Sequence, residues 1–292
     1  MSRWISLLVT VSVSLAVSLG AASAQQGQVP SDSRLKTIID KKSIRIAYRT
    51  DATPFSFRGE KDQPSGYSID ICQQVVKSIA QQFGTGDLNI QWVPVTVQTR
   101  FAAITGGQAD MECGSSTVTL GRMWEVDFSS FIFVESTGVV VTRASNVQAF
   151  TDMTGKKVAV IAGTTNEAAV KEQNRLHSLN LTIVTVKDRD EGMGLLDAGK
   201  VDGYASDKLL LVGTQIKRPE LIYMLPDDLS VEPYAIALPR GDWALRVAVN
   251  TGLSQVFRSG QIVGIFKRWF DQIGLQPGVL LRAAYTLGSL AP

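Results

Sequence analysis

The segment 44-IRIAYRTDATPFSFRGEKDQPSGYSIDICQQVVKSIAQQF-83 contains a short strand pattern followed by a long helix pattern. Residues 44–48, Ile-Arg-Ile-Ala-Tyr, have the short, mainly apolar pattern of a strand. Farther on, apolar residues recur at helical spacing, at Ile69, Cys72, Val76, Ile79 and Phe83. A strand that leads into a helix is the repeating unit of layered α/β proteins, so this segment predicts that fold class.

The alternation of strand and helix patterns continues along the rest of the chain. Strand patterns lie at residues 88–95, 110–113, 157–162, 181–186 and 201–205, and helix patterns lie at 98–104, from Asn166 and at 192–198. Regular alternation of this kind favours largely parallel sheets covered by helices. Extended segments at 138–143 and 232–239 bracket the second block, and they are natural crossings between two lobes.

The sequence therefore predicts a two-lobed α/β fold. The first lobe is discontinuous and comprises residues 35–138 and 240–292, because the helical pattern at 242–273 can pack back on it. The second lobe is an insertion that comprises residues 139–239, with the crossings at its ends. Residues 25–34 are polar and aperiodic, and are predicted to be a flexible lead.

Residues 1–24 have the layout of a secretory signal peptide. Arg3 precedes an apolar run over residues 4–19, and the small residues Ala22-Ser23-Ala24 follow it. Cleavage after Ala24 and export are expected, and a permanent membrane anchor is the alternative.

Composition and motifs argue against several classes of function. Lys and Arg total 29 against 27 Asp and Glu, and no dense basic run occurs, so a nucleic-acid partner is not expected. His177 is the only histidine and lies in a polar stretch, and no glycine-rich phosphate loop or GxSxG motif is present. No metal site, cofactor or catalytic constellation is therefore predicted, although an enzyme remains an alternative.

Cys72 and Cys113 are the only two cysteines. Disulfides persist in the oxidising compartments to which exported proteins travel, so the two residues are candidates for a bridge. The alternative is that both are small buried apolar residues. The separation of their Cα atoms decides between the two, and the sequence leaves the question open.

Two polar turns follow predicted strands, where open α/β sheets bind ligands. The first is 113-CGSST-117 followed by Arg122, which combines hydroxyls, backbone N–H groups and a guanidinium that fits a carboxylate. The second is Gly163-Thr164-Thr165, at the start of a helix whose N-terminus attracts anions. Each turn taken alone is also typical of helix capping. The two turns would face the same cleft from the two lobes.

The residues Gly66-Tyr67-Ser68-Ile69-Asp70-Ile71 resemble the signature of family 3 solute-binding proteins, the polar amino acid receptors of ABC importers. Further matches follow in the family's order between Leu35 and Gly274, at Arg100, 110-DMECGSST-117, Arg122, 126-VDFS-129, 163-GTT-165 and Asp207. The resemblance implies a type II periplasmic-binding-protein fold, with the ligand in a cleft between lobes that close about a hinge. It also implies a periplasmic monomer that binds a small amino acid and delivers it to an ABC transporter permease.

The resemblance assigns a role to each residue of the two turns. Arg122, aided by Thr117 and Thr165, would hold the α-carboxylate of the ligand. Asp207 and Ser115 would hold its α-ammonium group. Charged hydrogen bonds to both groups select α-amino acids as a class.

The chain is most similar to the glutamate/aspartate-binding branch of this family, through Arg49, 98-QTR-100 and 112-ECGS-115. Arg49 and Arg100 would converge on a second carboxylate, which favours an acidic ligand. Val97 stands where this branch usually has a serine, so one polar contact is lost. Arg189 stands where a histidine is usual, and it is a further candidate ligand residue that carries a permanent charge.

Two other functions remain as alternatives. By resemblance, the same fold also serves periplasmic dehydratases that act on prephenate-like acids, for which Glu112 and Asp207 would be the candidate acids. The other alternative is a ligand-binding sensor module. Phe55 is a candidate for the wall of the cleft, with core packing as its alternative.

Overall fold

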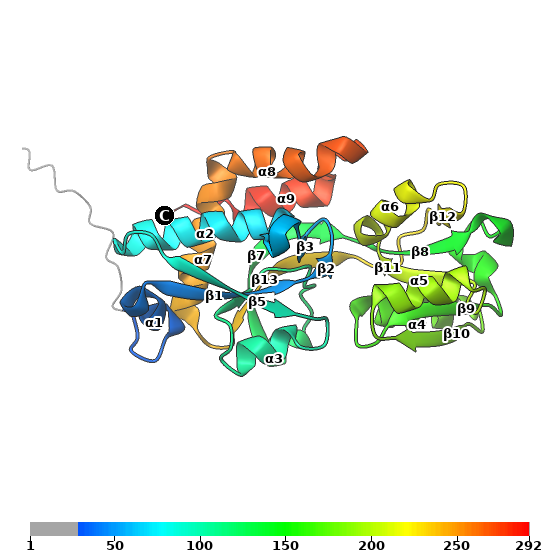
Figure 1. The fold of residues 1–292 in the computed structure, drawn as a ribbon, viewed down its shortest axis with the longest axis horizontal. Helices are drawn as coiled ribbons and strands as arrows, with labels where there is room; N and C mark the ends of the chain where they lie inside the picture. The colour runs from blue at the N-terminus through cyan, green and yellow to red at the C-terminus, as the bar shows by residue number, and fades with distance from the viewer. Residues whose placement is uncertain (1–28, 292) are drawn as a thin grey trace, which may run out of the picture.

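A computed structural model of the chain describes residues 29–291 and has two lobes, each built on a five-stranded sheet with helices packed against it (Figure 1). The predicted signal peptide at residues 1–24 and residues 25–28 of the predicted lead lie outside the described residues. The two-lobed α/β prediction is confirmed.

The first lobe contains a sheet in the order β5-β1-β6-β13-β7. β1 runs parallel to β5 and β6, whereas β13 is antiparallel to both β6 and β7. The strands of this lobe are β1 (Ser43–Arg49), β5 (Asn89–Val95), β6 (Met111–Glu112), β7 (Val126–Glu135) and β13 (Glu232–Pro239), with a small separate sheet of β2 (Asp51–Ala52), β3 (Ser56–Arg58) and β4 (Pro64–Ser65). Its helices are α1 (Arg34–Lys41), α2 (Tyr67–Phe83), α3 (Arg100–Thr105), α7 (Trp243–Arg258), α8 (Gln261–Phe270) and α9 (Val279–Gly288).

The second lobe contains a sheet in the order β10-β9-β11-β8-β12. β9 is parallel to β10 and β11, and β8 is antiparallel to β11 and β12. Its elements are β8 (Thr137–Thr142), β9 (Lys157–Ile161), α4 (Thr165–His177), β10 (Thr182–Val186), α5 (Arg189–Asp197), β11 (Gly203–Asp207), α6 (Lys208–Lys217) and β12 (Ile222–Met224).

The two segments predicted to be crossings are strands within the sheets. Residues 138–143 fall largely in β8 of the second sheet, and residues 232–239 form β13, which pairs with β7 of the first sheet. The chain instead passes between the lobes at Ser136 and through residues 225–231. The predicted limit of the second lobe at residue 239 therefore differs from the sheet membership of β13. An extended apolar pattern predicts a strand but does not identify the strand with which it pairs.

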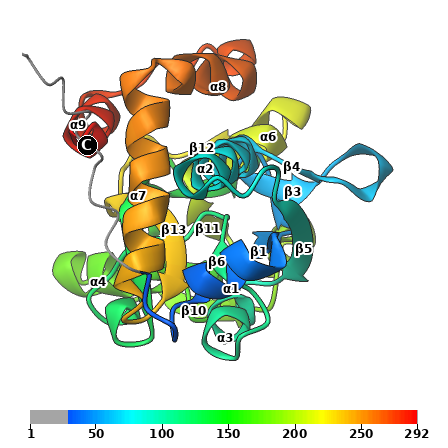
Figure 2. The same ribbon diagram turned by 90° about the vertical axis from the view of Figure 1, so that its left-hand side faces the viewer.

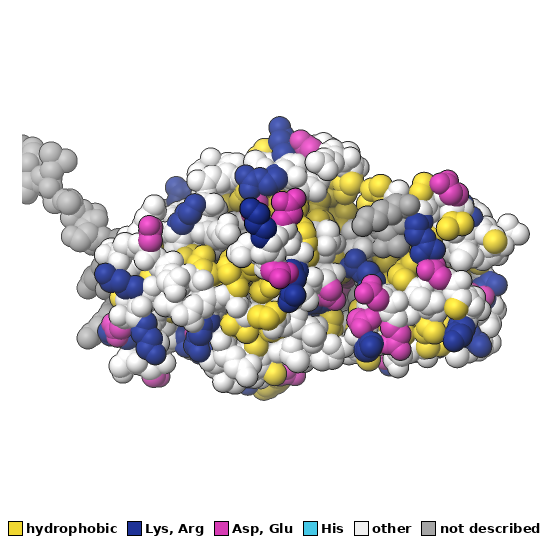
Figure 3. Space-filling view, viewed as in Figure 1, with side chains coloured by type: hydrophobic (Ala, Val, Ile, Leu, Met, Phe, Trp, Pro, Cys, Tyr) yellow, Lys and Arg dark blue, Asp and Glu magenta, His cyan; other side chains and the backbone are white. Residues whose placement is uncertain are grey.

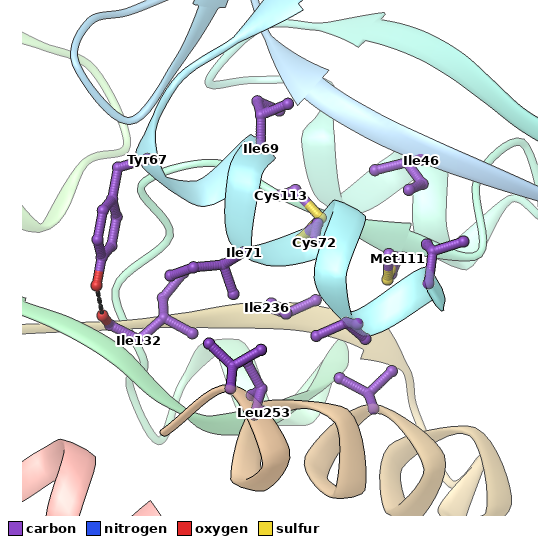
Figure 4. Packing of buried hydrophobic residues seen from close by; sticks show 14 of the residues in the cluster. Ile46, Tyr67, Ile69, Ile71, Cys72, Met111, Cys113, Ile132, Ile236 and Leu253 are labelled. Carbon is purple, nitrogen blue, oxygen red and sulfur yellow. Dashed lines mark hydrogen bonds between the residues drawn. A yellow bond between two sulfur atoms is a disulfide. The ribbon is translucent and has the colours of Figure 1, made fainter. Parts of the chain in front are cut away.

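The core of the first lobe lies between its sheet and α2, α7 and α8, and Figure 2 shows α8 at the upper end of the long helix α7. Cys72 of α2 and Cys113 after β6 form a disulfide, with Cα atoms 6.4 Å apart, which settles the question left open by the sequence (Figure 4). In the same core, the Tyr67 hydroxyl donates to the Ile132 carbonyl oxygen over 2.7 Å. Gly66 precedes α2 with φ of 136°, and a Cβ atom there would overlap the Phe55 carbonyl. Only glycine fits this turn.

The C-terminal helices pack back on the first lobe, as the helical pattern predicts. Beyond them, residues 279–288 form α9, whose order the sequence did not determine. Leu281 is buried against the first core, and the Tyr285 hydroxyl lies 2.5 Å from that of Tyr67. Among residues 29–291, no helix combines the length and the apolar character that a membrane crossing requires.

Candidate functional site

A pocket lies where the two lobes face each other. The first lobe contributes Arg49, Val97, Arg100, Ser115, Thr117 and Arg122. The second lobe contributes the polar residues Thr164, Thr165, Asn166, Ser206 and Asp207, together with Ile161 and Leu210. Seven of the eight residues predicted from the sequence are thus brought together. The lobes also touch directly, since the Gln98 side chain donates to the Lys187 carbonyl oxygen over 3.1 Å.

Arg189 is the predicted residue that does not line this pocket. It begins α5 and lies in an adjacent hollow with Thr53, Pro54 and Leu209. The two hollows share Leu210 as a lining residue.

Positive charge predominates in the pocket. On the face shown in Figure 3, Lys and Arg side chains are interspersed with Asp and Glu side chains over both lobes. Three guanidinium groups, from Arg49, Arg100 and Arg122, line the pocket. These three residues therefore dominate its electrostatics.

Arg49 is the last residue of β1, and a carboxylate from its own chain segment already pairs with it. Its Nε and Nη2 atoms lie 2.8 and 2.7 Å from Asp51 Oδ1, and its side chain is only 5% exposed. Gly114 packs closely behind it, because a Cβ atom at residue 114 would lie 3.2 Å from Arg49 Cγ and would overlap the Glu112 carboxylate. Glycine is required here so that both side chains can approach the loop.

Arg100 is a buried cation without an ionic partner among the described residues. It is the first residue of α3 and is 4% exposed, and its Nε atom has no hydrogen-bond partner. Burial, together with the nearby Arg122 charge, lowers the pKa of Arg100 to about 9, and the charges of Glu112 and Asp207 oppose this effect. The group therefore remains charged at neutral pH. A buried unpaired charge costs on the order of several kcal/mol. An anion that enters the pocket would offset that cost.

Arg122 begins a short 3₁₀ turn, Arg122–Trp124, after the first polar loop. Its Nη1 atom donates to the Thr117 carbonyl oxygen over 2.8 Å, which fixes the guanidinium beside that loop. Burial lowers the pKa of Arg122, and the charges of Glu232 and Asp207 oppose this effect. The remaining donors of the fork are available to a carboxylate, which matches its planar geometry.

Asp207 supplies the negative charge of the pocket. It ends β11 and is the N-cap residue of α6, yet its side chain makes no capping bond. Instead, Asp207 Oδ1 accepts a hydrogen bond of 2.8 Å from Asn166 Nδ2. Burial raises the pKa of Asp207 above its ordinary value, and a cationic group placed beside it would reverse that change.

The two predicted threonines meet across the cleft, with Thr117 Oγ1 and Thr165 Oγ1 3.4 Å apart. Thr164, next to Thr165, is the N-cap of α4 and accepts a hydrogen bond from the Glu167 N–H group over 3.1 Å. Thr164 therefore caps the helix as well as lining the pocket, and Thr165 lines the pocket at the positive end of the same helix.

Sequence reasoning missed two polar residues that support the pocket. Asn166 has the appearance of an ordinary residue in the first turn of a helix, yet its Nδ2 group bonds both Asp207 and Thr137. Glu232 lies in a segment interpreted as a crossing, and its carboxylate bonds the Thr117 hydroxyl over 2.6 Å. The only signal in the sequence was a carboxylate at the start of an apolar extended segment, Glu232, and an amide in the first turn of a helix, Asn166.

Glu112 and Phe55 are placed outside the pocket. The Glu112 carboxylate is fully buried, and neither oxygen has a hydrogen-bond partner among the described residues. Burial raises its pKa, and the charges of Arg100, Arg49 and Arg122 oppose this effect. The Ser116 hydroxyl lies near enough to oppose that shift but not in hydrogen-bond geometry. Phe55 packs in the core, with its ring centroid 4.9 Å from that of Phe133, so it is not a wall of the cleft. Phe55 lies in the turn between β2 and β3, and its ring belongs to the first-lobe core.

A larger hollow lies elsewhere, between α6, α9 and the crossings. Apolar side chains predominate in it, and its lysine, Lys208, already pairs with Asp228 at 2.6 Å. It therefore lacks the convergent free polar groups expected of a small-molecule site. Within residues 29–291, no group of three or more His, Cys, Asp or Glu side chains is placed to hold a metal ion.

Comparison with known proteins matches residues 44–272 to the family model described as bacterial extracellular solute-binding proteins, family 3. The L-glutamate/L-aspartate-binding protein of Pseudomonas aeruginosa is 32% identical over 241 residues, which cover 82% of this chain and 80% of that protein. The glutamate/aspartate import solute-binding protein of Escherichia coli is 28% identical over 263 residues, which cover 89% of this chain and 87% of that protein.

Solved structures show the same architecture. An ancestral amino acid-binding protein, described as a precursor of cyclohexadienyl dehydratase, is 26% identical with a TM-score of 0.70, over 82% of this chain and 100% of that chain. A substrate-binding protein of an ABC uptake transporter from Streptococcus pneumoniae, solved with bound histidine, has a TM-score of 0.72 at 20% identity, over 83% and 98% of the two chains. The second likeness shows the fold alone.

Proposed function

This chain belongs to family 3 of the bacterial extracellular solute-binding proteins, and we propose that it captures glutamate or aspartate in the periplasm for an ABC transporter permease. Its relatives in Pseudomonas aeruginosa and Escherichia coli are named for these two ligands. The pocket between the lobes supplies a chemical reason for the same preference.

The buried, unpaired guanidinium of Arg100 is the observation that carries the proposal. A neutral amino acid brings one carboxylate to the pocket, and Arg122 at the first polar loop suffices for it. A second carboxylate would form the ion pair that Arg100 makes with none of the described residues. Charged hydrogen bonds of this kind contribute about 1.5–3 kcal/mol each.

The ligand would lie with its backbone groups across the two polar turns. Arg122 and Thr165 would hold the α-carboxylate, at a guanidinium fork and a helix N-terminus respectively. Asp207 and Ser115 would hold the α-ammonium group. The ammonium would also bring the Asp207 pKa back toward its ordinary value, because the buried carboxylate would gain a cation.

The ligand side chain would extend toward Arg100 and Arg49. Arg49 already shares charge with Asp51, so Arg100 is the stronger of the two cationic sites. Val97 lies beside this part of the pocket and packs against the apolar cluster of the second lobe. It therefore supplies shape rather than a polar contact, and Arg189 would act only from the adjacent hollow.

A dehydratase acting on a prephenate-like acid is the second candidate, because a precursor of cyclohexadienyl dehydratase shares the fold. Of the two candidate acids, Glu112 does not line the pocket, and Asp207 is held by Asn166. A general acid must reach the reacting group within hydrogen-bond distance. The arrangement favours binding over catalysis.

Calorimetric titration of the mature protein, stripped of bound ligand by unfolding and refolding, tests the proposal. The panel comprises glutamate, aspartate, glutamine, asparagine, arginine and prephenate, and each mixture is analysed afterwards for chemical change. Tight binding of glutamate or aspartate without turnover is expected. Binding of a neutral or basic amino acid alone would overturn the acidic preference, and turnover of prephenate would overturn the binding function.

A further inference from the structure

We propose that Glu232 sets the preference of the pocket for a ligand that carries an amino group, by fixing the direction of the Thr117 hydroxyl. Glu232 is a positioning residue in this proposal, because it acts on the ligand through Thr117. The inference rests on the proposed function, in that the ligand is an α-amino acid.

The contact between the two side chains is short and buried. Glu232 is the first residue of β13, and it is 1% exposed. Its Oε2 atom accepts a hydrogen bond of 2.6 Å from Thr117 Oγ1. The backbones are also paired there, since the Val118 N–H group donates to the Pro233 carbonyl oxygen over 2.8 Å. The loop that carries Thr117 is therefore held in register with Glu232.

This contact decides what Thr117 presents to the pocket. A hydroxyl has one proton to donate and two lone pairs, whereas a carboxylate only accepts. With its proton directed at Glu232, Thr117 presents lone pairs to the cleft, and a lone pair accepts from an ammonium group. The alternative partner, Thr165 Oγ1, is 3.4 Å away and cannot compete with a carboxylate at 2.6 Å. Thr117 thus belongs with the ammonium group rather than with the α-carboxylate assigned from the sequence.

The other oxygen of Glu232 is fixed by the segments that join the lobes. Glu232 Oε1 lies 2.6 Å from Ser230 Oγ and 3.2 Å from Thr137 Oγ1, and both hydroxyls can donate to it. Thr137 Oγ1 in turn accepts from Asn166 Nδ2 over 2.8 Å. The same Asn166 group bonds Asp207. One buried network therefore orients both acceptors of the ammonium group, Thr117 and Asp207.

Glu232 also acts through its charge, and this effect must be separated from its effect on the hydroxyl. The charged and titratable groups that interact with it are Arg122, Asp207 and Tyr234, and Glu135 lies opposite it on the neighbouring strand β7. If Glu232 were only a counter-ion for Arg122, its removal would strengthen binding of every carboxylate equally. If it were only a structural residue, its removal would weaken all ligands equally. Neither case changes the ratio between a ligand with an amino group and the same ligand without one.

The test compares glutamate with glutarate, which has both carboxylates but no amino group. Wild-type protein and the Glu232→Gln variant are titrated with each, glutarate by competition where it binds weakly. In Glu232→Gln we expect the ratio of the glutamate Kd to the glutarate Kd to rise about tenfold or more over the wild-type ratio. The reason is that the charge-assisted hydrogen bond from the ligand ammonium group to Thr117 is lost. Glutarate should keep or gain affinity. An unchanged ratio overturns the proposal.

A second variant separates hydroxyl orientation from charge at a distance. Thr117→Val removes the hydroxyl and keeps the shape, and in its background Glu232→Gln should have little further effect on the ratio. The same loss in both backgrounds would mean that Glu232 acts directly through its charge, and would overturn the proposal. If Glu232→Gln does not fold, Thr117→Val alone tests the proposal, and it should weaken glutamate more than glutarate. Loss of a hydroxyl that donated to a ligand carboxylate would instead weaken both ligands equally, and would overturn the proposal.

Glu135→Gln is the matched control, since Glu135 pairs directly with Glu232 across the strands β7 and β13. It does not line the pocket, so the ratio should remain that of the wild type. A wild-type protein that binds no amino acid would refute the proposed function before any variant is made. A wild-type protein that binds glutamate, together with an unchanged ratio in Glu232→Gln, would refute this inference alone.

Discussion

Replacing Arg100 with methionine should separate acidic from neutral ligands and, at the same time, stabilise the protein without ligand. Methionine has a similar length and no charge, so the pocket wall is largely kept while the cation is removed. Arg100 has no ionic partner among the described residues and is almost fully buried. Its removal should therefore weaken the binding of acidic ligands and strengthen the folded state without ligand.

The magnitude follows from the environment of the guanidinium. Truncating one partner of a buried charge pair costs about 2–5 kcal/mol of binding free energy. Arg49 lies in the same pocket and would retain part of the attraction, so the lower part of this range applies. At about 1.4 kcal/mol per factor of ten, the Kd for glutamate should rise about 30- to 300-fold. The Kd for glutamine should change by about threefold or less, since its side chain brings no charge to be paired.

Calorimetric titration with glutamate and glutamine measures the first effect, and thermal unfolding without ligand measures the second. The melting temperature should rise, because a buried charge without an ion pair among the described residues is replaced by an apolar side chain. Glu112 nearby leaves no unpaired charge behind, because burial already raises its pKa and loss of the cation raises it further, so it takes up a proton. Arg258→Met on the exposed face of α7 is the control and should change neither quantity. Equal losses for glutamate and glutamine, or a lower melting temperature without ligand, would refute the reasoning about Arg100.

Three further predictions address the rest of the pocket and the scaffold. Arg122→Met should abolish calorimetric binding of acidic and neutral amino acids alike, because both would bring an α-carboxylate to Arg122; retained glutamine binding would contradict this role. Joint replacement of Cys72 and Cys113 by serine removes a cross-link with a sequence separation of 41, for which loop entropy predicts a loss of about 4 kcal/mol in unfolding free energy, measurable by urea titration. Burial raises the pKa of Glu135 to about 8, so the folded state keeps a proton that the unfolded state releases, and stability contributed by this group falls as pH rises from about 4.5 to 8. Glu135→Gln should therefore raise the melting temperature at pH 8 and leave it nearly unchanged at pH 4, and an equal change at both would contradict the assignment.

Much of the architecture could be predicted because the local spacing of apolar side chains indicates which segments are strands and which are helices. The strand at β1 and the long helix α2 follow from side-chain spacing alone, and both are observed. The position of β13 could not be predicted in this way. Its residues read as an extended apolar stretch in any context, and its place between β6 and β7 depends on pairing with strands about a hundred residues earlier in the chain.

The pocket residues were predictable for a different reason. Arg100 and Asp207 were found by resemblance to a family, because an isolated arginine or aspartate carries no local signal. Asn166 and Glu232 were missed, since each supports the pocket by hydrogen bonds to other side chains. Such contacts join residues that lie far apart in the sequence, so they form only when each lobe has folded.

The central position of β13 also constrains how the chain can fold as it emerges from its N-terminus. Until residues 232–239 are available, β6 and β7 each have an unpaired edge in the middle of the future sheet. The second lobe is contiguous and can complete its own sheet during that interval. Unpaired edges are templates for aggregation, so the unfinished first lobe is the part of a nascent or translocating chain that most requires protection by a chaperone.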